Sequence, residues 1–322
     1  MNQPPNPPVQ PQAALPGCWW HPNRPTGLSC ARCGRPACPD CLREAPVGFQ
    51  CTDCVHSGTQ QQRQQHRQYQ NSGLGQRTIA GARLSKSFVV TSTLLAINVV
   101  FFLVTVLQTK SIWDNGNAPL EQLGWLQPYA TLGGGEWWRI FTSGFVHFGL
   151  IHIAANMFSL WMIGRGLEQI FGKVRFLAVY FVSMLGASTA VLLFDNPGQA
   201  SGGASGALFG LMGCYAVIVV KLKLNPAGLL VTLAINAYIT FSIPRISILA
   251  HVGGLVTGAL VAVAILYAPE RDKARWQAIG VGIIVVALLG LVIYRGAQLP
   301  SADCRFTDQV INGIRQYNCF IA

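Results

Sequence analysis

Long apolar runs, repeated from Ser87 onward, are the feature that most constrains how this chain can fold. An α-helix needs about 20 apolar residues to cross the ~30 Å hydrocarbon core of a bilayer. Seven runs approach this length, at 87–107, 148–167, 174–194, 204–221, 227–243, 248–268 and 276–294. The whole chain is 51% hydrophobic and only 11% charged, which is typical of a polytopic membrane protein and unlike a soluble enzyme. We therefore expect an all-α membrane protein with seven spans.

Lysines and arginines between these runs predict the orientation, because cytoplasmic loops carry an excess of basic residues. With a cytoplasmic N-terminus, 17 of the 23 basic residues fall inside. The six that fall outside are Lys110, Arg139, Arg245, Arg295, Arg305 and Arg315. We expect a multi-pass protein of the cell membrane whose N-terminus is cytoplasmic and whose C-terminus is extracytoplasmic.

The formal net charge of +11 does not indicate a nucleic-acid partner. Nucleic-acid-binding modules gather basic and aromatic residues on one face, whereas here the basic residues are scattered between apolar runs. We therefore expect no nucleic acid to bind.

The N-terminal part of the chain differs in composition from the rest. Residues 1–17 are rich in Pro and Gln and lack the basic and apolar regions of a secretory signal, which predicts a disordered leader. Residues 18–56 hold seven of the ten cysteines, and 57–86 form a Gln-rich polar segment that we interpret as a flexible linker. The membrane domain would then occupy 87–294, followed by an extracytoplasmic tail, 295–322.

Four Cys/His pairs, each with two residues between its members, predict two tetrahedral zinc sites. Joining neighbouring pairs would leave spacers of eight and nine residues, whereas interleaving them leaves 16 and 17, the usual separation between the halves of a zinc site. We therefore prefer the interleaved arrangement. Its first site is Cys18, His21, Cys38 and Cys41, and its second is Cys30, Cys33, Cys51 and Cys54.

This module is too small to fold on apolar burial alone, so bound metal would supply its stability. Four protein ligands leave no open position on zinc, which indicates two structural zinc ions. We expect the module to have a structural role or to bind a cytosolic protein partner, and not to catalyse a reaction. His56 is interpreted as a solvated linker residue. Of the other cysteines, Cys214 is expected to pack as a small apolar side chain. Cys304 and Cys319 both lie on the predicted outside, where a disulfide would be stable.

Polar side chains occur near the beginnings of the three spans that run from outside to inside. They are His152 and Asn156 on the second span, Ser205 on the fourth and His251 on the sixth. The topology puts all four at similar depth. Polar groups in hydrocarbon are costly unless they pair or face a wet cavity, so they are functional candidates. The alternative is that these side chains only form hydrogen bonds between helices.

Glycines favour close contact between the fourth and sixth spans. Gly202 and Gly203 permit a tight loop before Ser205. Small-residue faces suited to helix packing follow the serine and the histidine. They are Gly206, Gly210 and Gly213 on the fourth span, and Gly254 and Gly258 on the sixth. Contact along these faces would bring His251 within reach of Ser205.

A serine within hydrogen-bond reach of a histidine is suited to nucleophilic acyl transfer, because the imidazole takes the hydroxyl proton and returns it to the leaving amine. The nearest acids, Asp195 and Glu136, lie in predicted loops, which favours a Ser–His dyad over a triad. The oxyanion would be held by the backbone N–H of Ser205 together with His152 and Asn156, which share a helical face at i and i+4.

Together these motifs resemble the rhomboid family of intramembrane serine proteases. The matching motifs are GASG with Ser205, AHVGG with His251, HIAAN with His152 and Asn156, and EWWR at Glu136–Arg139. The resemblance covers residues 87–294 and implies a six-helix core with a seventh transmembrane helix appended at the C-terminus. The N-terminal module is similar to a B-box zinc-binding domain.

The resemblance implies hydrolysis of a peptide bond in or near the transmembrane segment of single-span membrane proteins, without a cofactor for catalysis. Ser205 would be the nucleophile and His251 the general base, while His152 and Asn156 would line the oxyanion hole. Phe209 would pack against the catalytic imidazole.

The EWWR motif has two interpretations. Trp137 and Trp138 could belong to an aromatic belt at the membrane surface. In rhomboids the corresponding loop lies partly in the outer leaflet, and Arg139 would fix it there. We favour the second interpretation, since a belt does not require the arginine. His147 is interpreted as structural support for this loop.

Three other function classes are less consistent with the sequence. A catalytically inactive rhomboid-like protein that binds membrane clients usually lacks the serine or the histidine, and both are present. A transporter or channel would place charged residues within its spans, but apart from histidine the spans hold none away from their ends. A scaffold built on the zinc module would need only one or two spans as an anchor. We therefore expect a protease.

Overall fold

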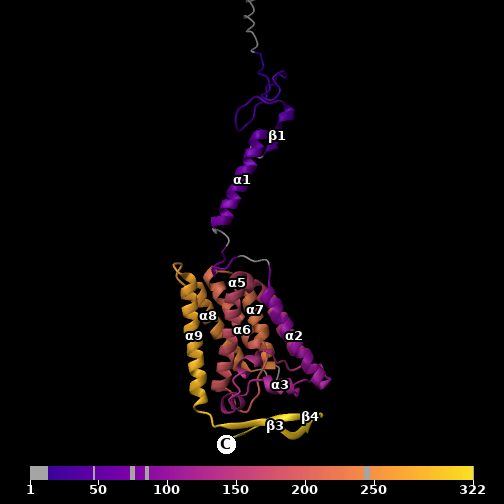
Figure 1. Cartoon of the computed structure of the whole chain (residues 1–322), viewed down its shortest axis with the longest axis vertical. Helices are drawn as coiled ribbons and strands as arrows, with labels where there is room; N and C mark the ends of the chain where they lie inside the picture. Colours follow the sequence, from indigo (N-terminus) through magenta and orange to yellow (C-terminus); the bar gives the residue numbers. More distant parts are fainter. Residues whose placement is uncertain (1–13, 46–47, 73–76, 84–86, 243–246, 322) are drawn as a thin grey trace, which may run out of the picture. The chain divides into compact units, whose positions relative to one another are not determined.

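The computed structural model describes residues 14–45, 48–72, 77–83, 87–242 and 247–321 (Figure 1). The chain divides into two compact units, Met1–Gln76 and Arg77–Ala322. Most of the predicted leader lies outside the described residues. Its last residues belong to the first unit, because Gly17 pairs with Pro25 and the backbone N–H of Thr26 donates to Pro16.

The first unit has little regular structure before its final helix. It contains the 3₁₀ turn η1 (Pro39–Cys41), the antiparallel strands β1 (Leu42–Ala45) and β2 (Gly48–Cys51), and α1 (Thr52–Ser72). Among the described residues, its buried cluster consists of cysteines and two aliphatic residues, Ala37 and Leu42. So small an apolar core is typical of a module that metal ions stabilise.

Helix α1 occupies much of the segment that was expected to be a flexible linker. This part of the chain has no apolar periodicity, and its side chains from Thr59 to Gln64 are exposed. Gln and Arg are nonetheless good helix formers, and neither Gly nor Pro occurs in the helix after Gly58. Intrinsic propensity therefore accounts for a helix here that packing does not require.

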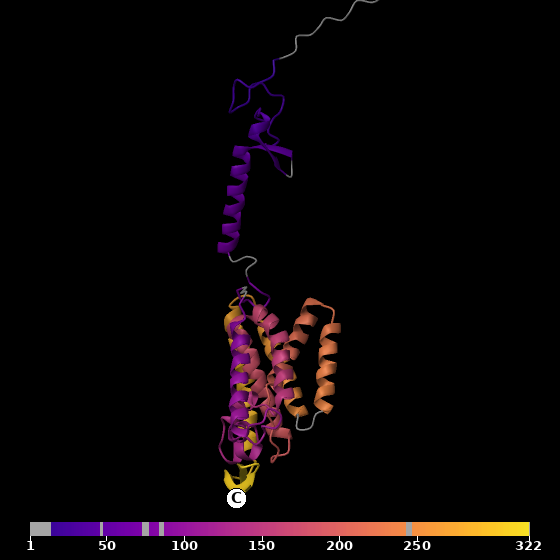
Figure 2. The same cartoon turned by 90° about the vertical axis from the view of Figure 1, so that its right-hand side faces the viewer.

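The second unit is a helical bundle with a two-stranded hairpin at one end (Figures 1 and 2). Its elements are α2 (Val89–Thr109), α3 (Pro119–Gly124), η2 (Tyr129–Gly133), α4 (Arg139–Thr142), η3 (Ser143–Phe145), α5 (Leu150–Phe194), α6 (Ser205–Leu222), α7 (Ala227–Ser242), α8 (Ile248–Leu266), α9 (Lys273–Gly296), β3 (Ala302–Ile311) and β4 (Ile314–Ile321). The predicted helical membrane architecture is confirmed. The chain is a multi-pass membrane protein.

Five helices of the described residues are long and apolar enough to cross a membrane, namely α2, α5, α6, α8 and α9. Helix α5 is 45 residues long and leaves helical geometry at Gly172 (φ 71°, ψ 167°), so it comprises both the second and the third predicted spans. Helix α7 has 16 residues and is shorter than a typical span. The end of the fifth predicted span, residue 243, lies outside the described residues.

Helices α6 and α8 touch backbone to backbone along the glycines that were predicted to form small-residue faces. A Cβ atom on Gly254 would lie 1.9 Å from the carbonyl oxygen of Gly206, and one on Gly258 would lie 2.0 Å from that of Gly210. A Cβ on Gly213 would similarly lie 2.1 Å from the carbonyl oxygen of Leu255. The predicted contact between the fourth and sixth spans is therefore confirmed.

The predicted C-terminal tail is an ordered hairpin, which the sequence did not indicate. Strands β3 and β4 are antiparallel, with Cys304 directly opposite Cys319 and joined to it by a disulfide. The hairpin lies across the end of the bundle at which α2 and α9 end (Figure 1).

Candidate active site and metal centres

Ser205 is the first residue of α6 and is half-buried. The preceding residues, 201–204, are here termed the serine loop. Ser201 exchanges two backbone hydrogen bonds of 2.8 Å with Leu126, and the N–H of Gly203 donates to the carbonyl of Ser143 at 2.8 Å. Gly203 has φ +126°, a conformation that L-residues rarely adopt. The glycine and its neighbours therefore fix how the helix presents Ser205.

His251 lies in the first turn of α8, which Ser247 caps by accepting a 3.2 Å hydrogen bond from the N–H of Ala250. The imidazole is 5% exposed and stacks on Phe209, with ring centroids 4.0 Å apart and planes inclined by 12°. Phe209 is thus placed as the resemblance implied. Because Phe209 and Ser205 are on the same helix, this stacking fixes the imidazole relative to the serine.

One cavity of about 190 Å³ joins the four predicted catalytic residues. Ser205, His251, His152 and Asn156 all line it, together with side chains of α5, α6 and α7. The four residues, which the topology predicted to lie at a similar depth, thus line a single site.

The hydrogen-bonding of His152 defines its neutral tautomer. The backbone N–H of Phe148 donates to Nδ1 at 3.3 Å, so a neutral imidazole carries its proton on Nε2. A Cβ on Gly203 would lie 2.8 Å from Nε2 of His152 and 3.6 Å from Oγ of Ser205. The N–H of His152 therefore lies beside the serine loop, where only a glycine fits.

Asn156 is one turn further along α5 and is 5% exposed. Its side-chain amide donates to the carbonyl of His152 at 3.0 Å. A primary amide has two N–H groups, so the second remains for a ligand in the cavity.

The turn that precedes α5 contains a buried polar network. Some of its residues were not identified as candidates from the sequence. Asn115 donates to the carbonyl of His147 at 3.0 Å and accepts from the N–H of Gly149 at 2.6 Å. Glu121 accepts from the N–H of His147 at 3.2 Å, and the His147 ring lies 5.2 Å from that of His152. No motif marked Asn115 or Glu121, because their partners are distant in sequence.

Burial decides the charge state of two members of this network. It raises the pKa of the Glu121 carboxyl to about 8. It also lowers the pKa of His147 to about 3, with a further contribution from His152. His147 is therefore neutral at physiological pH, as expected for a residue that supports the loop.

Arg139 of the EWWR motif fixes the loop, as the favoured interpretation predicted. The guanidinium is fully buried, donates to the carbonyls of Gln122 and Trp125 at 2.8 and 2.9 Å, and pairs with Glu136 at 2.5 Å. Trp137 and Trp138 are 45% and 52% exposed, which is also compatible with an interfacial belt.

The two acids considered for a triad have other partners. Glu136 binds Arg139 and the hydroxyl of Tyr317. Asp195 accepts from the hydroxyl of Ser247 at 3.1 Å. Both carboxylates are therefore used to hold structure around the site.

The first unit brings together the two sets of four ligands that the interleaved pairing predicted. Within each set the ligand atoms all lie within 4.8 Å of one another. The two sets are Cys18, His21, Cys38 and Cys41, and Cys30, Cys33, Cys51 and Cys54.

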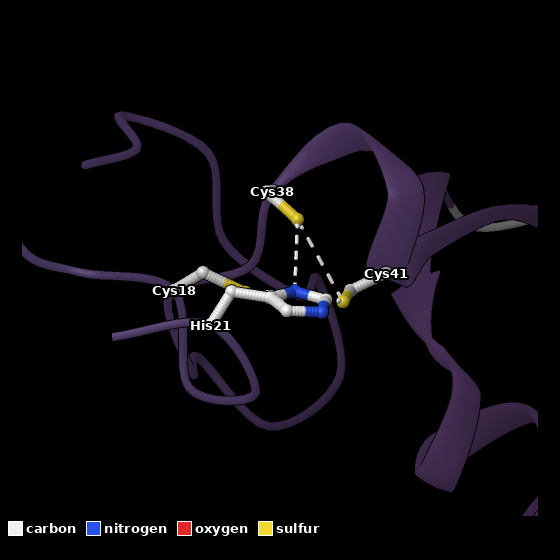
Figure 3. A group of neighbouring side chains, drawn as sticks. All are labelled: Cys18, His21, Cys38 and Cys41. Carbon is white, nitrogen blue, oxygen red and sulfur yellow. Dashed lines mark hydrogen bonds between the residues drawn. The ribbon is translucent and has the colours of Figure 1, made fainter. Parts of the chain in front are cut away.

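The separations within these sets fit zinc. A tetrahedral ion with Zn–S bonds of ~2.3 Å places two sulfurs about 3.8 Å apart. Cys38 and Cys41 are 3.7 Å apart, and Cys33 and Cys51 are 3.8 Å apart. In the first set, Nδ1 of His21 lies among the three sulfurs, 3.3 Å from that of Cys41 (Figure 3). Each set can therefore hold a metal ion with all four positions filled by protein.

Comparison with known proteins follows the same division of the chain. A family model described as "Rhomboid domain" matches residues 134–268, which include Ser205, His251, His152 and Asn156. The zinc module and the C-terminal hairpin lie outside the matched region.

Several curated proteins are similar to part of this chain. "Rhomboid protease GluP" of Bacillus subtilis is 31% identical over 52% of this chain and 33% of its own length. "Putative rhomboid protease YdcA" of the same organism is 32% identical over 42% of this chain and 71% of its own length. "RHOMBOID-like protein 5" of Arabidopsis thaliana is 38% identical over 42% of this chain and 46% of its own length.

The match to such relatives is partial. The chain spans a third of the length of GluP and about half that of RHOMBOID-like protein 5. A further relative, 33% identical over 47% of this chain and 44% of its own length, is named "Inactive RHOMBOID-like protein 8". Similarity alone therefore does not distinguish an active from an inactive protein, and the residues of the site must be considered.

Proposed function

The chain belongs to the rhomboid family, and from this premise we propose that it is an intramembrane serine protease that uses a Ser205–His251 dyad. The observation that carries the proposal is the shared cavity, which both side chains line together with His152 and Asn156. The contact of α6 with α8 and the stacking of Phe209 on His251 support it further.

In the proposed reaction, His251 takes the hydroxyl proton while Oγ of Ser205 attacks the carbonyl carbon of the scissile peptide bond. The oxyanion of the tetrahedral intermediate accepts hydrogen bonds from Nε2 of His152 and from the amide of Asn156. Collapse of the intermediate breaks the C–N bond, and His251 gives its proton to the leaving amine. Water then hydrolyses the acyl-enzyme by the same sequence of proton transfers.

The composition of the cavity favours a membrane segment as substrate. Beyond the polar residues, its walls include Phe158 and Met162 on α5 and Ile235 on α7. Apolar walls around a few polar groups suit an apolar chain whose backbone is bound at one point. We therefore propose that single-span membrane proteins are the substrates and that they meet the enzyme within the lipid bilayer.

A second, narrower cavity favours a small residue at the cleaved bond. It has a volume of about 30 Å³ and is lined by Ser205, Met184 and Ala187, among others. This space holds little more than a water molecule or a small side chain. Met184 and Ala187 leave no room for a large side chain at this position.

For the first unit we propose two structural zinc ions and a cytosolic protein partner, with the N-terminus cytoplasmic and the C-terminus extracytoplasmic. The closed donor sets support a structural role, since a catalytic zinc keeps an open position. The excess of basic residues on the predicted inside and the disulfide on the predicted outside support the orientation.

The test is cleavage of a labelled single-span substrate by the purified protein reconstituted in lipid. Ser205→Ala and His251→Ala should abolish cleavage without unfolding the protein. Ser159→Ala is the matched control, because Ser159 lines the same cavity but has no proposed chemical role. If wild type fails to cleave the substrate, as both dyad variants do, the protein belongs with the inactive relatives. Binding of membrane clients is then the better description.

A further inference from the structure

The C-terminal hairpin makes specific contacts with the loop between α2 and α5, here termed the first loop (residues 110–149). The side-chain amide of Gln122 accepts from the N–H of Tyr317 at 2.5 Å and donates to the carbonyl of Arg315 at 3.0 Å. Gln122 is fully buried, and its amide also donates to the carbonyl of Asn117 within the first loop at 2.7 Å. Among the described contacts, its side-chain oxygen therefore depends on β4 for a hydrogen bond. The amide thus pairs with β4 much as a neighbouring strand would.

Tyr317 also contacts both members of the buried ion pair of the first loop. Its hydroxyl binds the carboxylate of Glu136, and its ring lies 5.1 Å from the guanidinium carbon of Arg139. A buried ion pair is stable only when its remaining hydrogen-bonding groups find partners. Tyr317 therefore supplies, from the hairpin, a partner that the first loop itself does not provide.

Close packing and the disulfide hold the hairpin in this position. A Cβ on Gly133 would lie 2.6 Å from the carbonyl oxygen of Pro300, and one on Gly134 would lie 3.2 Å from Sγ of Cys304. Cys319 lies two residues beyond Tyr317 on the same face of β4, opposite Cys304. The disulfide therefore fixes the strand pair next to the tyrosine.

The first loop is in turn hydrogen-bonded to the serine loop. Arg139 binds the carbonyl of Trp125, and the next residue, Leu126, exchanges two hydrogen bonds with Ser201. The first loop also supplies the carbonyl of Ser143, which accepts from Gly203. Hydrogen bonds thus connect Tyr317 to both sides of the loop that presents Ser205.

We infer that the hairpin Ala302–Ile321 is a brace for the active site, and that Tyr317 is a positioning residue that acts through Arg139 and the first loop on Ser205. The inference rests on the proposed function. The hairpin lies outside the matched rhomboid region, and the proposed chemistry of the dyad does not by itself give it a role.

The test compares Tyr317→Ala and Tyr317→Phe in the full-length purified protein. The control is Arg305→Ala, because Arg305 is on the hairpin but its side chain is 67% exposed and pairs only with Asp303 and Phe320 among the described contacts. Two quantities are measured: the rate at which a fluorophosphonate labels Ser205, and amide hydrogen exchange over 119–145 and 199–204.

If the hairpin is a brace, Tyr317→Ala slows labelling by roughly three- to thirtyfold, the usual range for coupling through a contact network. For cleavage, kcat should fall while KM changes little. Exchange should become faster over both segments, while the amides of the α6–α8 contact keep wild-type protection. Tyr317→Phe keeps the ring over Arg139 and should lie between wild type and the alanine variant, and Arg305→Ala should match wild type.

The inference is overturned if exchange over 199–204 is unchanged, or if protection falls equally throughout the bundle, since the hairpin would then stabilise the fold in general. Hydrogen exchange also separates this inference from the proposed function. If the wild-type protein neither reacts with the probe nor cleaves a substrate, the proposed function fails, and the exchange over 199–204 still decides whether the hairpin braces the serine loop.

Discussion

The ring of Phe209 lies parallel to the imidazole of His251, with centroids 4.0 Å apart, and thereby ties the candidate base on α8 to the helix that carries Ser205. An aromatic pair of this kind contributes ~0.5–1.5 kcal/mol beyond its area burial. Loss of this contact would let the imidazole turn away from the serine without removing any reacting group.

We therefore expect Phe209→Leu to lower kcat by about two- to tenfold with little change in KM, which corresponds to the energy of the aromatic pair. Phe209→Tyr retains the stacking and should keep most of the activity. Steady-state cleavage of a labelled substrate measures both variants. Equal activity of the leucine variant and wild type would mean that the aromatic contact does not orient the base.

The tautomer of His152 gives a second prediction. Its Nδ1 accepts from Phe148, so only Nε2–H can donate to an oxyanion. Loss of one oxyanion donor typically costs about 10²–10³ in kcat, so His152→Ala should show a loss of this size. Glutamine can place an N–H at a similar distance, and His152→Gln should recover part of the rate. An alanine variant with wild-type kcat would remove His152 from the oxyanion hole.

Much of the candidate site could be predicted from the sequence, because its determinants are local or periodic. Gly254 and Gly258 repeat at four-residue spacing, which favours close contact between helices in a membrane. The two-residue spacing within the cysteine pairs and the length of their spacers likewise predicted the two ligand sets. Matched depth followed from counting spans, which requires only the apolar runs and the basic loops.

What could not be predicted depends on contacts between distant residues. Gln122 and Tyr317 are 195 positions apart, and neither lies in a recognisable motif. In the sequence Glu121 is an ordinary acid of the first loop, and only the folded protein buries it against His147. Helix α1 was missed for a different reason, since the prediction relied on apolar periodicity and that helix has none.

A third prediction concerns stability against pH. Burial raises the pKa of the Glu121 carboxyl to about 8, well above the value of 4.5 for a solvated glutamate. The folded protein then binds this proton more tightly than the unfolded chain does, so the stabilisation is complete below pH 4.5 and is lost as the pH rises through 8. The free energy of unfolding should therefore fall over this interval.

Glu121→Gln removes the ionisable group while keeping an amide oxygen for the N–H of His147. Thermal unfolding in detergent should show a weaker pH dependence for this variant, and a higher melting temperature than wild type near pH 9. His147 provides the acid-side contrast. Because the pKa of His147 is lowered to about 3, the free energy of unfolding should fall as the pH drops toward 3. This acid-side decrease should be the same in wild type and in Glu121→Gln. Identical alkaline profiles would contradict a buried, protonated Glu121.

Metal content gives a fourth prediction, because the two ligand sets differ chemically. One holds three cysteines and a histidine, and the other holds four cysteines. The full chain should bind two zinc ions, and cobalt substitution should give separate absorption bands for the S₃N and S₄ sites.

Cys41→Ser should alter only the S₃N bands, whereas Cys51→Ser should alter only the S₄ bands. His56→Ala is the control, since His56 belongs to neither set and should leave both sites intact. If Cys41→Ser instead perturbed the S₄ bands, the interleaved pairing would be wrong. Removal of zinc with a chelator should unfold the first unit, because its small apolar core cannot replace the metal bonds.

A fifth prediction tests whether the contact of α6 with α8 holds the dyad together. A Cβ on Gly254 would lie 1.9 Å from the carbonyl oxygen of Gly206, so Gly254→Ala must separate the two helices. Backbone cannot yield as a flexible side chain can, and Ser205 directly precedes Gly206 on the same helix. We expect loss of cleavage together with a marked fall in the unfolding temperature. Gly290→Ala is the matched control, because a methyl group added to this helical glycine of α9 would meet no atom within 4 Å. An alanine at that position should be neutral or stabilising, since alanine is favoured over glycine in a helix by about 1 kcal/mol. Wild-type cleavage by Gly254→Ala would show that the serine and the histidine can cooperate without close contact of their helices, which contradicts the proposed arrangement of the dyad.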